Sequence, residues 1–334
     1  MKVSNASMEI LEAYDIPNFE VSFVSNSDCE IHRIKFGSSI SVGEGRFTTE
    51  AALRIFPKEK SIFENIQSEV IWLNELANEG VYAPIPLRNK TGEFINEVLN
   101  SDGTIQYAIV LTWLSGDFLD ESLTESRLAE VGTLLSRLHN TSKLLVNSGT
   151  LKSNKHSFQC KFDLWVSEGR PKTHYISADF LRNSGVAAGI VREKIATMDC
   201  NANSYGFIHG DLHQWNLLFK NNMAGAIDFS DCGWGHYGYD LATVLLYLKY
   251  PLVGNFDHRG NYDRLRSALL GSYGSLCSLP ADIESQTDTY IIAKLLSNLE
   301  WILDDWSHPS RFSWGPSYIN KANCILREYA HTSG

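Results

Sequence analysis

Two short polar segments lie close together in the second half of the chain, HGDLHQWN (209–216) and IDFSD (227–231). Apolar residues frame the first of them, with FI before it and LLF after it. Polar groups held between apolar anchors are costly to bury without partners. Residues of these types at this spacing therefore indicate a site that does chemistry.

Three of these side chains suit phosphoryl transfer. Asn216 and Asp228 carry oxygens that an intervening hairpin would bring together, and oxygen ligands suit a hard cation such as Mg²⁺. Asp211 lies on the loop before that hairpin, from which it could face the same site and accept a proton from a hydroxyl group. One Asp that orients the nucleophile, with an Asn and a second Asp that hold metal against a triphosphate, is the layout of phosphoryl transfer.

The loop needs a rigid frame, and the second half of the chain supplies one. WNLLF (215–219) and AGAIDF (224–229), joined by KNNM, predict a hairpin directly after the polar loop. We expect this to be the only hairpin in a region that is otherwise helical. Apolar residues at helical spacing mark helices near 128–138, 241–248, 262–277 and 282–305.

The first third of the chain predicts mainly strands. Segments 19–25 and 29–36 alternate in period two around the turn Asn26-Ser27-Asp28, which favours a hairpin. One helix is expected at roughly 60–79, where apolar residues recur at steps of three and four. Further strands are expected at 47–56, 92–99 and 104–114.

Together these elements predict an α+β fold with two lobes. Residues 1–115 would form a β-rich N-terminal lobe that carries one helix, and residues 116–334 a mostly helical C-terminal lobe. A short connector near 115–117 would join them. A chain of 334 residues is long for one core, which favours this division.

The composition of the chain limits the classes of partner and the cellular location to expect. A net charge of −10 without any run of five basic residues argues against nucleic acid as a partner. The six cysteines are scattered, without a CxxC pair, so neither a zinc knuckle nor a disulfide framework is expected. The first residues lack a signal-peptide pattern, and the longest apolar runs are too short to span a bilayer. We expect a reduced cytoplasmic protein with no membrane segment.

The two polar segments also carry a family resemblance. HGDLHQWN and IDFSD resemble the HxDxxxxN and DF motifs of the aminoglycoside phosphotransferase and choline kinase-like family, whose fold is protein kinase-like. GYDLA (238–242) and GTLLSRLHN (132–140) are similar to further segments of that family. The resemblance spans about the whole chain, with the specific part at 207–242. It implies Mg²⁺ and ATP, or another nucleoside triphosphate, as cofactors.

The resemblance implies a role for each residue of the C-terminal motif. Asp211 would be the catalytic base, and Asn216 and Asp228 would bind Mg²⁺. Asp240 would tie down the catalytic loop, and His209 would support it through hydrogen bonds. His213 could either touch phosphate or face solvent.

In the N-terminal lobe the resemblance implies a nucleotide site. Arg54 would contact phosphates, with Glu69 as its partner from the helix. Adenine would lie against the backbone near Leu111, Trp113 and Leu114. No GxGxxG motif is present, and the turn around Ser27 is the candidate phosphate cover.

Two departures besides the missing GxGxxG motif separate the chain from protein kinases. Arg54 stands where those enzymes use Lys, and Ser230 follows the DF pair in place of glycine. These departures favour the small-molecule branch of the family over a Ser/Thr protein kinase, which remains an alternative of the same fold. The expected reaction moves the γ-phosphoryl of the nucleotide to a hydroxyl of an aminoglycoside, amino alcohol, homoserine or sugar-like acceptor.

The chain's last third gives one hint about the acceptor. Trp301 and Asp305 are four residues apart and would share a helix face. An acidic group beside an aromatic ring suits a cationic amine. Ordinary helix packing with an acidic solvated face explains the same pattern equally well.

A metal-dependent hydrolase is the alternative from another class. His209, Asp211 and His213 alternate, so an extended strand would turn all three to one face, where they could hold a metal such as Zn²⁺. In that interpretation Asn216 and the N-terminal lobe would have no role. A kinase-like binding module without turnover is a second rival, and retention of all three motif residues argues against it.

Overall fold

Five strands of the N-terminal half form one antiparallel sheet in the order β1-β2-β3-β5-β4. In this computed structural model the described residues are 5–14, 16, 18–26, 29–43, 45–57, 62–99, 103, 105–119, 123–156, 176–253, 259–281, 283–304 and 309–333. The strands are β1 (Phe19–Asn26), β2 (Glu30–Ser41), β3 (Phe47–Ile55), β4 (Ile95–Leu99) and β5 (Ile105–Thr112). The predicted strands and the first hairpin are thereby confirmed.

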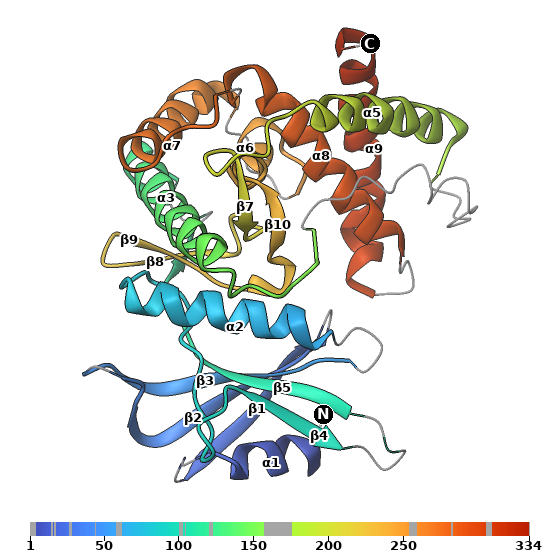
Figure 1. Ribbon diagram of the computed structural model, residues 1–334. Coiled ribbons are helices and arrows are strands. Elements are labelled where there is room, and N and C mark those ends of the chain that lie inside the picture. Colours follow the sequence, from blue (N-terminus) through green and yellow to red (C-terminus); the bar gives the residue numbers. More distant parts are fainter. Residues whose placement is uncertain are drawn as a thin grey trace.

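Two helices flank this sheet on opposite faces (Figure 1). Helix α1 (Asn5–Glu12), which the sequence did not predict, packs Ile10 and Leu11 against the outer face of the sheet. Helix α2 (Phe63–Asn78) confirms the helix predicted near 60–79 and lies between the sheet and the C-terminal half.

Helix α2 joins the two halves of the molecule through its apolar face. The ring of Trp72 contacts Phe207 and Phe229 edge-on, at centroid distances of 5.4 and 5.3 Å. Phe207 precedes the first polar segment and Phe229 lies within the second, so α2 is packed directly against the frame of the candidate site. Aromatic contacts of this geometry stabilise by about 0.5–1.5 kcal/mol beyond area burial.

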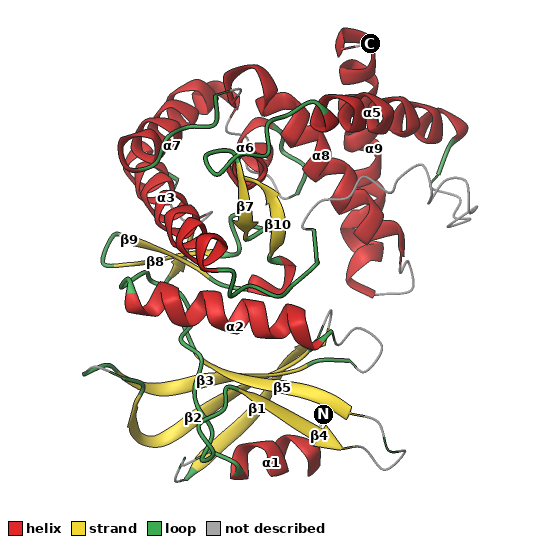
Figure 2. Cartoon of the chain, viewed as in Figure 1, coloured by secondary structure: helices red, strands yellow, loops and turns green. Residues whose placement is uncertain are grey.

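The C-terminal half is mostly helical, as predicted (Figure 2). Helices α3, α6, α7 and α8 contribute to one large apolar core. The helices are α3 (Glu125–Ser148), α5 (Ala178–Ala196), α6 (Tyr237–Lys249), α7 (Tyr262–Leu276), α8 (Ile283–Asp304) and α9 (Pro309–Ser333).

Two small sheets lie within this helical half, where the sequence predicted one hairpin. The predicted hairpin is β8 (Leu217–Lys220) with β9 (Met223–Ala226), extended by β6 (Asp117–Phe118). A second antiparallel pair, β7 (Tyr205–Ile208) with β10 (Gly233–His236), corrects the expectation of a single hairpin. These strands bracket the two polar segments and fix where they begin and end.

The predicted division at residues 115 and 116 falls between β5 and β6. β5 belongs to the N-terminal sheet, whereas β6 pairs with β8 of the C-terminal half. Within the described residues, no helix is both long and apolar enough to cross a membrane.

Candidate active site

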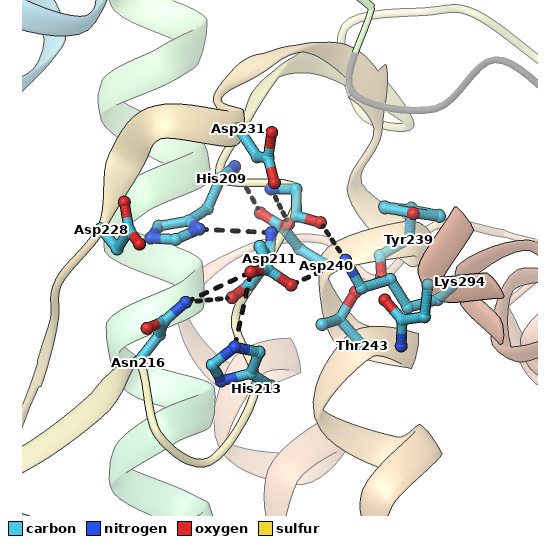
Figure 3. Close-up of polar contacts among 12 residues, drawn as sticks. His209, Asp211, His213, Asn216, Asp228, Asp231, Tyr239, Asp240, Thr243 and Lys294 are labelled. Atoms are coloured by element: carbon cyan, nitrogen blue, oxygen red, sulfur yellow. Dashed lines mark hydrogen bonds and ion pairs between the residues drawn. The ribbon is translucent and has the colours of Figure 1, made fainter. Parts of the chain in front are cut away.

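The polar loop HGDLHQWN runs from the end of β7 to the start of β8, and one buried carboxylate holds its beginning. Asp240, fully buried in the first turn of α6, accepts hydrogen bonds from the backbone N–H of His209 at 2.9 Å and of Gly210 at 2.7 Å (Figure 3). Gly210 has a φ of +82°, which glycine adopts without strain. The loop therefore leaves the strand sharply and in a fixed direction.

A histidine supports Asp240 from the other side. His139 Nε2 lies 3.1 Å from Asp240 Oδ2, and its Nδ1 accepts from the Tyr273 hydroxyl at 2.9 Å. The helix predicted near 128–138 would put His139 at its C-terminal end, where a histidine commonly acts as a cap, and this was wrong. Helix α3 continues to Ser148, so His139 lies inside it and is fully buried.

The His139–Asp240 pair makes folding stability depend on pH. Burial lowers the pKa of His139 below its ordinary value of 6.5, although Asp240 acts in the opposite direction. The folded protein therefore binds this proton less readily than the unfolded chain. The contribution of His139 to folding is complete above pH 6.5 and declines as the pH falls below it.

We expect the unfolding free energy to fall between about pH 7 and about pH 5.5, and His139→Gln to flatten that slope. Gln does not titrate, and it should cost about 1–3 kcal/mol at neutral pH because Asp240 loses a well-placed donor. Urea unfolding at both pH values measures this. His331→Gln, at an exposed position, is the matched control and should keep the original slope. An unchanged slope in His139→Gln would contradict the prediction.

His209 connects the two polar segments through hydrogen bonds at both nitrogens of its ring. Its Nε2 donates to the carbonyl of Ile227 at 3.1 Å, and its Nδ1 accepts the N–H of Asp211 at 3.3 Å. The ring also packs on Phe229, with centroids 4.5 Å apart. Because both ring nitrogens of His209 form hydrogen bonds, one to each segment, His209 fixes the distance between Asp211 and the segment that carries Asp228.

Asp211 lies half-buried at the centre of the site and has three side-chain neighbours (Figure 3). Lys294 Nζ, from α8, is 2.7 Å from Oδ1. His213 Nε2 and Asn216 Nδ2 lie 3.5 and 3.4 Å from Oδ2. Burial lowers the pKa of His213, with Asp211 acting in the opposite direction, which favours a neutral imidazole at pH 7. His213 thus faces Asp211, with a side chain that is 21% exposed.

Asn216 and Asp228 offer oxygens that fit a hard cation. Asn216 Nδ2 donates to the backbone carbonyl of Asp211 at 2.9 Å, which turns the amide oxygen to the opposite side. Asp228, at a φ of +60°, precedes a short 3₁₀ turn and accepts from the Ser230 hydroxyl through Oδ1 at 2.8 Å. Its carboxylate is exposed toward the same side as Asn216 (Figure 3). An amide and a carboxylate oxygen form a donor set suited to Mg²⁺.

In the N-terminal half, Arg54 and Glu69 form a buried ion pair. Arg54 Nη1 donates to Glu69 Oε1, and Arg54 Nε lies 3.5 Å from Cys29 Sγ. Arg54 is 4% exposed, and its Nη2 has no hydrogen-bond partner among the described residues. A buried guanidinium nitrogen without a partner is costly unless a ligand supplies an acceptor. Ser27, the predicted phosphate contact, lies outside the described residues.

The residues predicted beside adenine lie at the end of β5 and directly after it. Leu111 is buried in the large core, and Trp113 and Leu114 are half-buried. The backbone N–H of Trp113 donates to the carbonyl of Glu50 at 3.0 Å, so that amide is already used by the sheet.

A cavity of about 440 Å³ opens beside Asp211. Aromatic rings form much of its wall, and Trp301 and Trp314 lie nearly parallel with centroids 6.3 Å apart. Trp301 lines this cavity, whereas Asp305, the other residue from which the sequence hinted at an amine-bearing acceptor, lies outside the described residues. The lining residues are Asp211, His213, Trp215, Asp228, Asp231, Tyr247, Val253, Lys294, Ser297, Asn298, Trp301, Ile302 and Trp314.

The sequence interpretation missed Lys294. It lies in α8, far along the chain from the polar loop, and only the fold brings it to Asp211. One local signal was present, because Lys294 interrupts the apolar run YIIAKLLS. A single charged residue in such a run is almost never fully buried unless it is paired.

The hydrolase alternative needs His209, Asp211 and His213 on one face of a strand. Strand β7 ends at Ile208, and the ring of His209 spends both nitrogens on backbone groups. No group of three or more His, Cys, Asp or Glu side chains gathers as a metal site within the described residues. The local geometry therefore disfavours that alternative.

Comparison with known proteins identifies the class. Residues 39–274 match the profile of the phosphotransferase enzyme family, and the chain belongs to that family. Over 192 residues it is 27% identical to the amicoumacin kinase of Bacillus subtilis (strain 168). This match covers 56% of the chain and spans only about half, 54%, of that relative.

Two solved structures share the fold. An amicoumacin kinase in complex with AMP-PNP, Ca²⁺ and Ami aligns with a TM-score of 0.76 at 17% identity, covering 98% of this chain and 93% of that one. A microcompartment-associated aminopropanol kinase aligns with a TM-score of 0.77 at 20% identity, covering 98% of both chains. The predicted α+β, two-lobed, protein kinase-like fold is confirmed.

Proposed function

We propose that this protein is a Mg²⁺-dependent phosphotransferase that moves the γ-phosphoryl of ATP, or of another nucleoside triphosphate, to a hydroxyl of a small molecule. The observation that carries the proposal is the setting of Asp211. Its half-buried carboxylate is held by neighbours on both oxygens and borders a cavity of about 440 Å³. Asn216 and Asp228 both lie on one side of Asp211 (Figure 3).

In this proposal Asp211 accepts the proton of the acceptor hydroxyl. The hydroxyl oxygen forms a bond to the γ-phosphorus while the bond to the bridging β–γ oxygen breaks, and the nucleoside diphosphate leaves. Most of the rate comes from positioning and charge neutralisation, because the loose transition state leaves little covalent work for the protein.

The charge balance requires a cation at the proposed metal site. Asn216 and Asp228 would hold Mg²⁺, which neutralises charge on the triphosphate when it is bound. The net charge of −10 supports this, since a polyanionic nucleotide would otherwise approach an acidic protein. Asp240, His139 and His209 would keep the loop in place through the hydrogen bonds described above.

Arg54 would contact the phosphates with its free nitrogen while Glu69 orients it. We expect Arg54→Lys to raise the KM for ATP about 10- to 100-fold, because one charge-assisted hydrogen bond is worth about 1.5–3 kcal/mol. Lysine can form a hydrogen bond with Glu69 or with a phosphate, but it lacks the planar guanidinium group that can bond to both. Steady-state kinetics measures the change, with the exposed Arg182→Lys as control. An unaltered KM would remove Arg54 from the nucleotide site.

The cavity wall supports an acceptor that carries an amine. Aromatic rings and the carboxylates of Asp211 and Asp231 line it, a combination that attracts cations through charge and cation–π contact. The aminopropanol kinase of the same fold acts, by its name, on an amino alcohol. An amino alcohol or amino sugar is therefore the acceptor class to try first.

A thermal-shift titration tests the nucleotide half of this proposal. ATP with Mg²⁺ should raise the unfolding midpoint, since a ligand that binds only the folded state must stabilise it, and ATP without Mg²⁺ should raise it less. Metal analysis of the purified protein accompanies it. Absence of any nucleotide shift together with stoichiometric bound transition metal would overturn the proposal in favour of a hydrolase.

A further inference from the structure

Lys294 is the charged group in the site that the motif does not explain. It projects from α8 into the loop, is 4% exposed, and also lines the cavity beside Asp211 (Figure 3). We propose that Lys294 is a positioning residue that fixes the carboxylate of Asp211 for proton transfer. The inference rests on the proposed function and adds a residue to its machinery.

Both contacts of the Lys294 ammonium go to the same stretch of loop. Nζ lies 2.7 Å from Asp211 Oδ1 and 3.1 Å from the carbonyl of Gly210. It also lies 5.9 Å from the ring centroid of Tyr239. Lys294 therefore binds the backbone carbonyl before Asp211 and also the carboxylate of Asp211. These two contacts restrain both the position and the rotation of the Asp211 side chain.

The ammonium remains charged in this setting. Burial is the largest single effect and lowers the pKa of Lys294, but the groups around it that act in the opposite direction, Asp211 first among them, together outweigh burial and raise the pKa above its ordinary value of 10.5. A buried ion pair of this kind is weak evidence for stability, because desolvation offsets much of its attraction. Its place at the reacting carboxylate favours a role in turnover.

The contact also distinguishes the two oxygens of Asp211. Oδ1 is occupied by Lys294 at 2.7 Å, whereas Oδ2 has only the longer contacts to Asn216 and His213, at 3.4 and 3.5 Å. Oδ2 is thus the oxygen available to an acceptor hydroxyl. Without Lys294 the carboxylate could rotate about its χ2 angle and lose this alignment.

The face of α8 that carries Lys294 also forms part of the wall of the cavity proposed to bind the acceptor. Four further residues of the helix line the same cavity, at steps of three, four, seven and eight from Lys294, which places them on one helix face. They are Ser297, Asn298, Trp301 and Ile302. A single rigid helix therefore sets the distance between the acceptor wall and Asp211, as sites built on regular elements generally require.

A double-mutant cycle on turnover tests the inference. Lys294→Met is expected to lower kcat about 10²-fold, the scale of a misplacement of about 1 Å, while the KM for ATP stays within about threefold. In an Asp211→Asn background, the same substitution should change kcat by less than about threefold, because Lys294 acts through Asp211. If Lys294 had a purely structural role, its replacement would impair kcat and the KM for ATP together, or would reduce only the amount of folded protein.

Lys249→Met is the matched control. It also removes a lysine that is paired with an aspartate, since Lys249 Nζ lies 2.6 Å from Asp288 of α8. Asp288 is not among the residues that line the cavity, so turnover should be unchanged. Wild-type kcat in Lys294→Met would overturn the inference.

The outcomes separate this inference from the proposed function. If the wild-type protein transfers no phosphoryl group to any acceptor, the proposed function fails; if it does, and Lys294→Met is equally fast, only the inference fails. If Lys294→Met does not fold, the double variant, which leaves no unpaired charge, decides the case. A kcat more than about tenfold below that of Asp211→Asn alone would show that Lys294 acts independently of Asp211 and contradict the inference.

Discussion

Replacing Asp211 by Asn is expected to lower kcat by about 10²–10⁴-fold, the usual contribution of a positioned general base. Asn keeps the size of the side chain and its contact with Lys294, but its amide cannot accept the proton of the acceptor hydroxyl. The proposed nucleotide contacts at Arg54 and the proposed metal ligands are untouched, so Mg²⁺-ATP binding should change little.

Two measurements on the same preparation check this expectation. Initial rates give kcat, and a thermal-shift titration with Mg²⁺-ATP gives the binding response. Asp288→Asn is the matched control, since Asp288 is also paired with a lysine but lies away from the cavity. Turnover of Asp211→Asn within a few fold of the wild-type value would exclude Asp211 as the base.

Replacing Asp228 by Ala should abolish the Mg²⁺ dependence of nucleotide binding and lower turnover by at least about 10²-fold. The Asp228 carboxylate is exposed and lies on the same side of Asp211 as Asn216, and Ser230 occupies only its Oδ1. One neutral amide cannot replace a carboxylate as a ligand for a hard cation.

A Mg²⁺ titration at fixed ATP concentration measures this effect through the thermal midpoint. The wild-type protein and Asp288→Ala should both show a Mg²⁺-dependent rise, and Asp228→Ala should show none. An unaltered Mg²⁺ titration in Asp228→Ala would count against its role as a metal ligand. Removal of divalent metal with a chelator should bring the wild-type response down to that of the variant.

Much of the fold could be predicted because local sequence specified it. Segments 19–25 and 29–36 alternate cleanly, and the helix near 60–79 has a regular apolar face, so both predictions are confirmed. Strands β7 and β10 escaped prediction because YGFI and GWGH are four residues long and contain glycine, which carries no strand preference. Helix α1 escaped because its stability comes from packing of Ile10 and Leu11 on the sheet.

The residues of the site likewise divide into those that local sequence could predict and those that depend on how the chain packs. The polar residues of 209–216 and 227–231 are close in sequence, and the spacing of the hairpin sufficed to predict that they meet. Lys294 could not be placed, because its contact with Asp211 depends on how α8 packs against the loop. The position of His139 inside α3 likewise depends on a helix end at Ser148, ten residues beyond the one that the apolar pattern suggested.

The most direct test of the central claim is transfer of label from [γ-³²P]ATP to an acceptor by the purified protein. Amino alcohols, aminoglycosides and neutral sugars serve as acceptors, with Mg²⁺ present or chelated. We expect a labelled phosphate ester with at least one amine-bearing acceptor, formed only with Mg²⁺ and lost in Asp211→Asn. Label that reaches only inorganic phosphate, or ester formed equally well by Asp211→Asn, would contradict it.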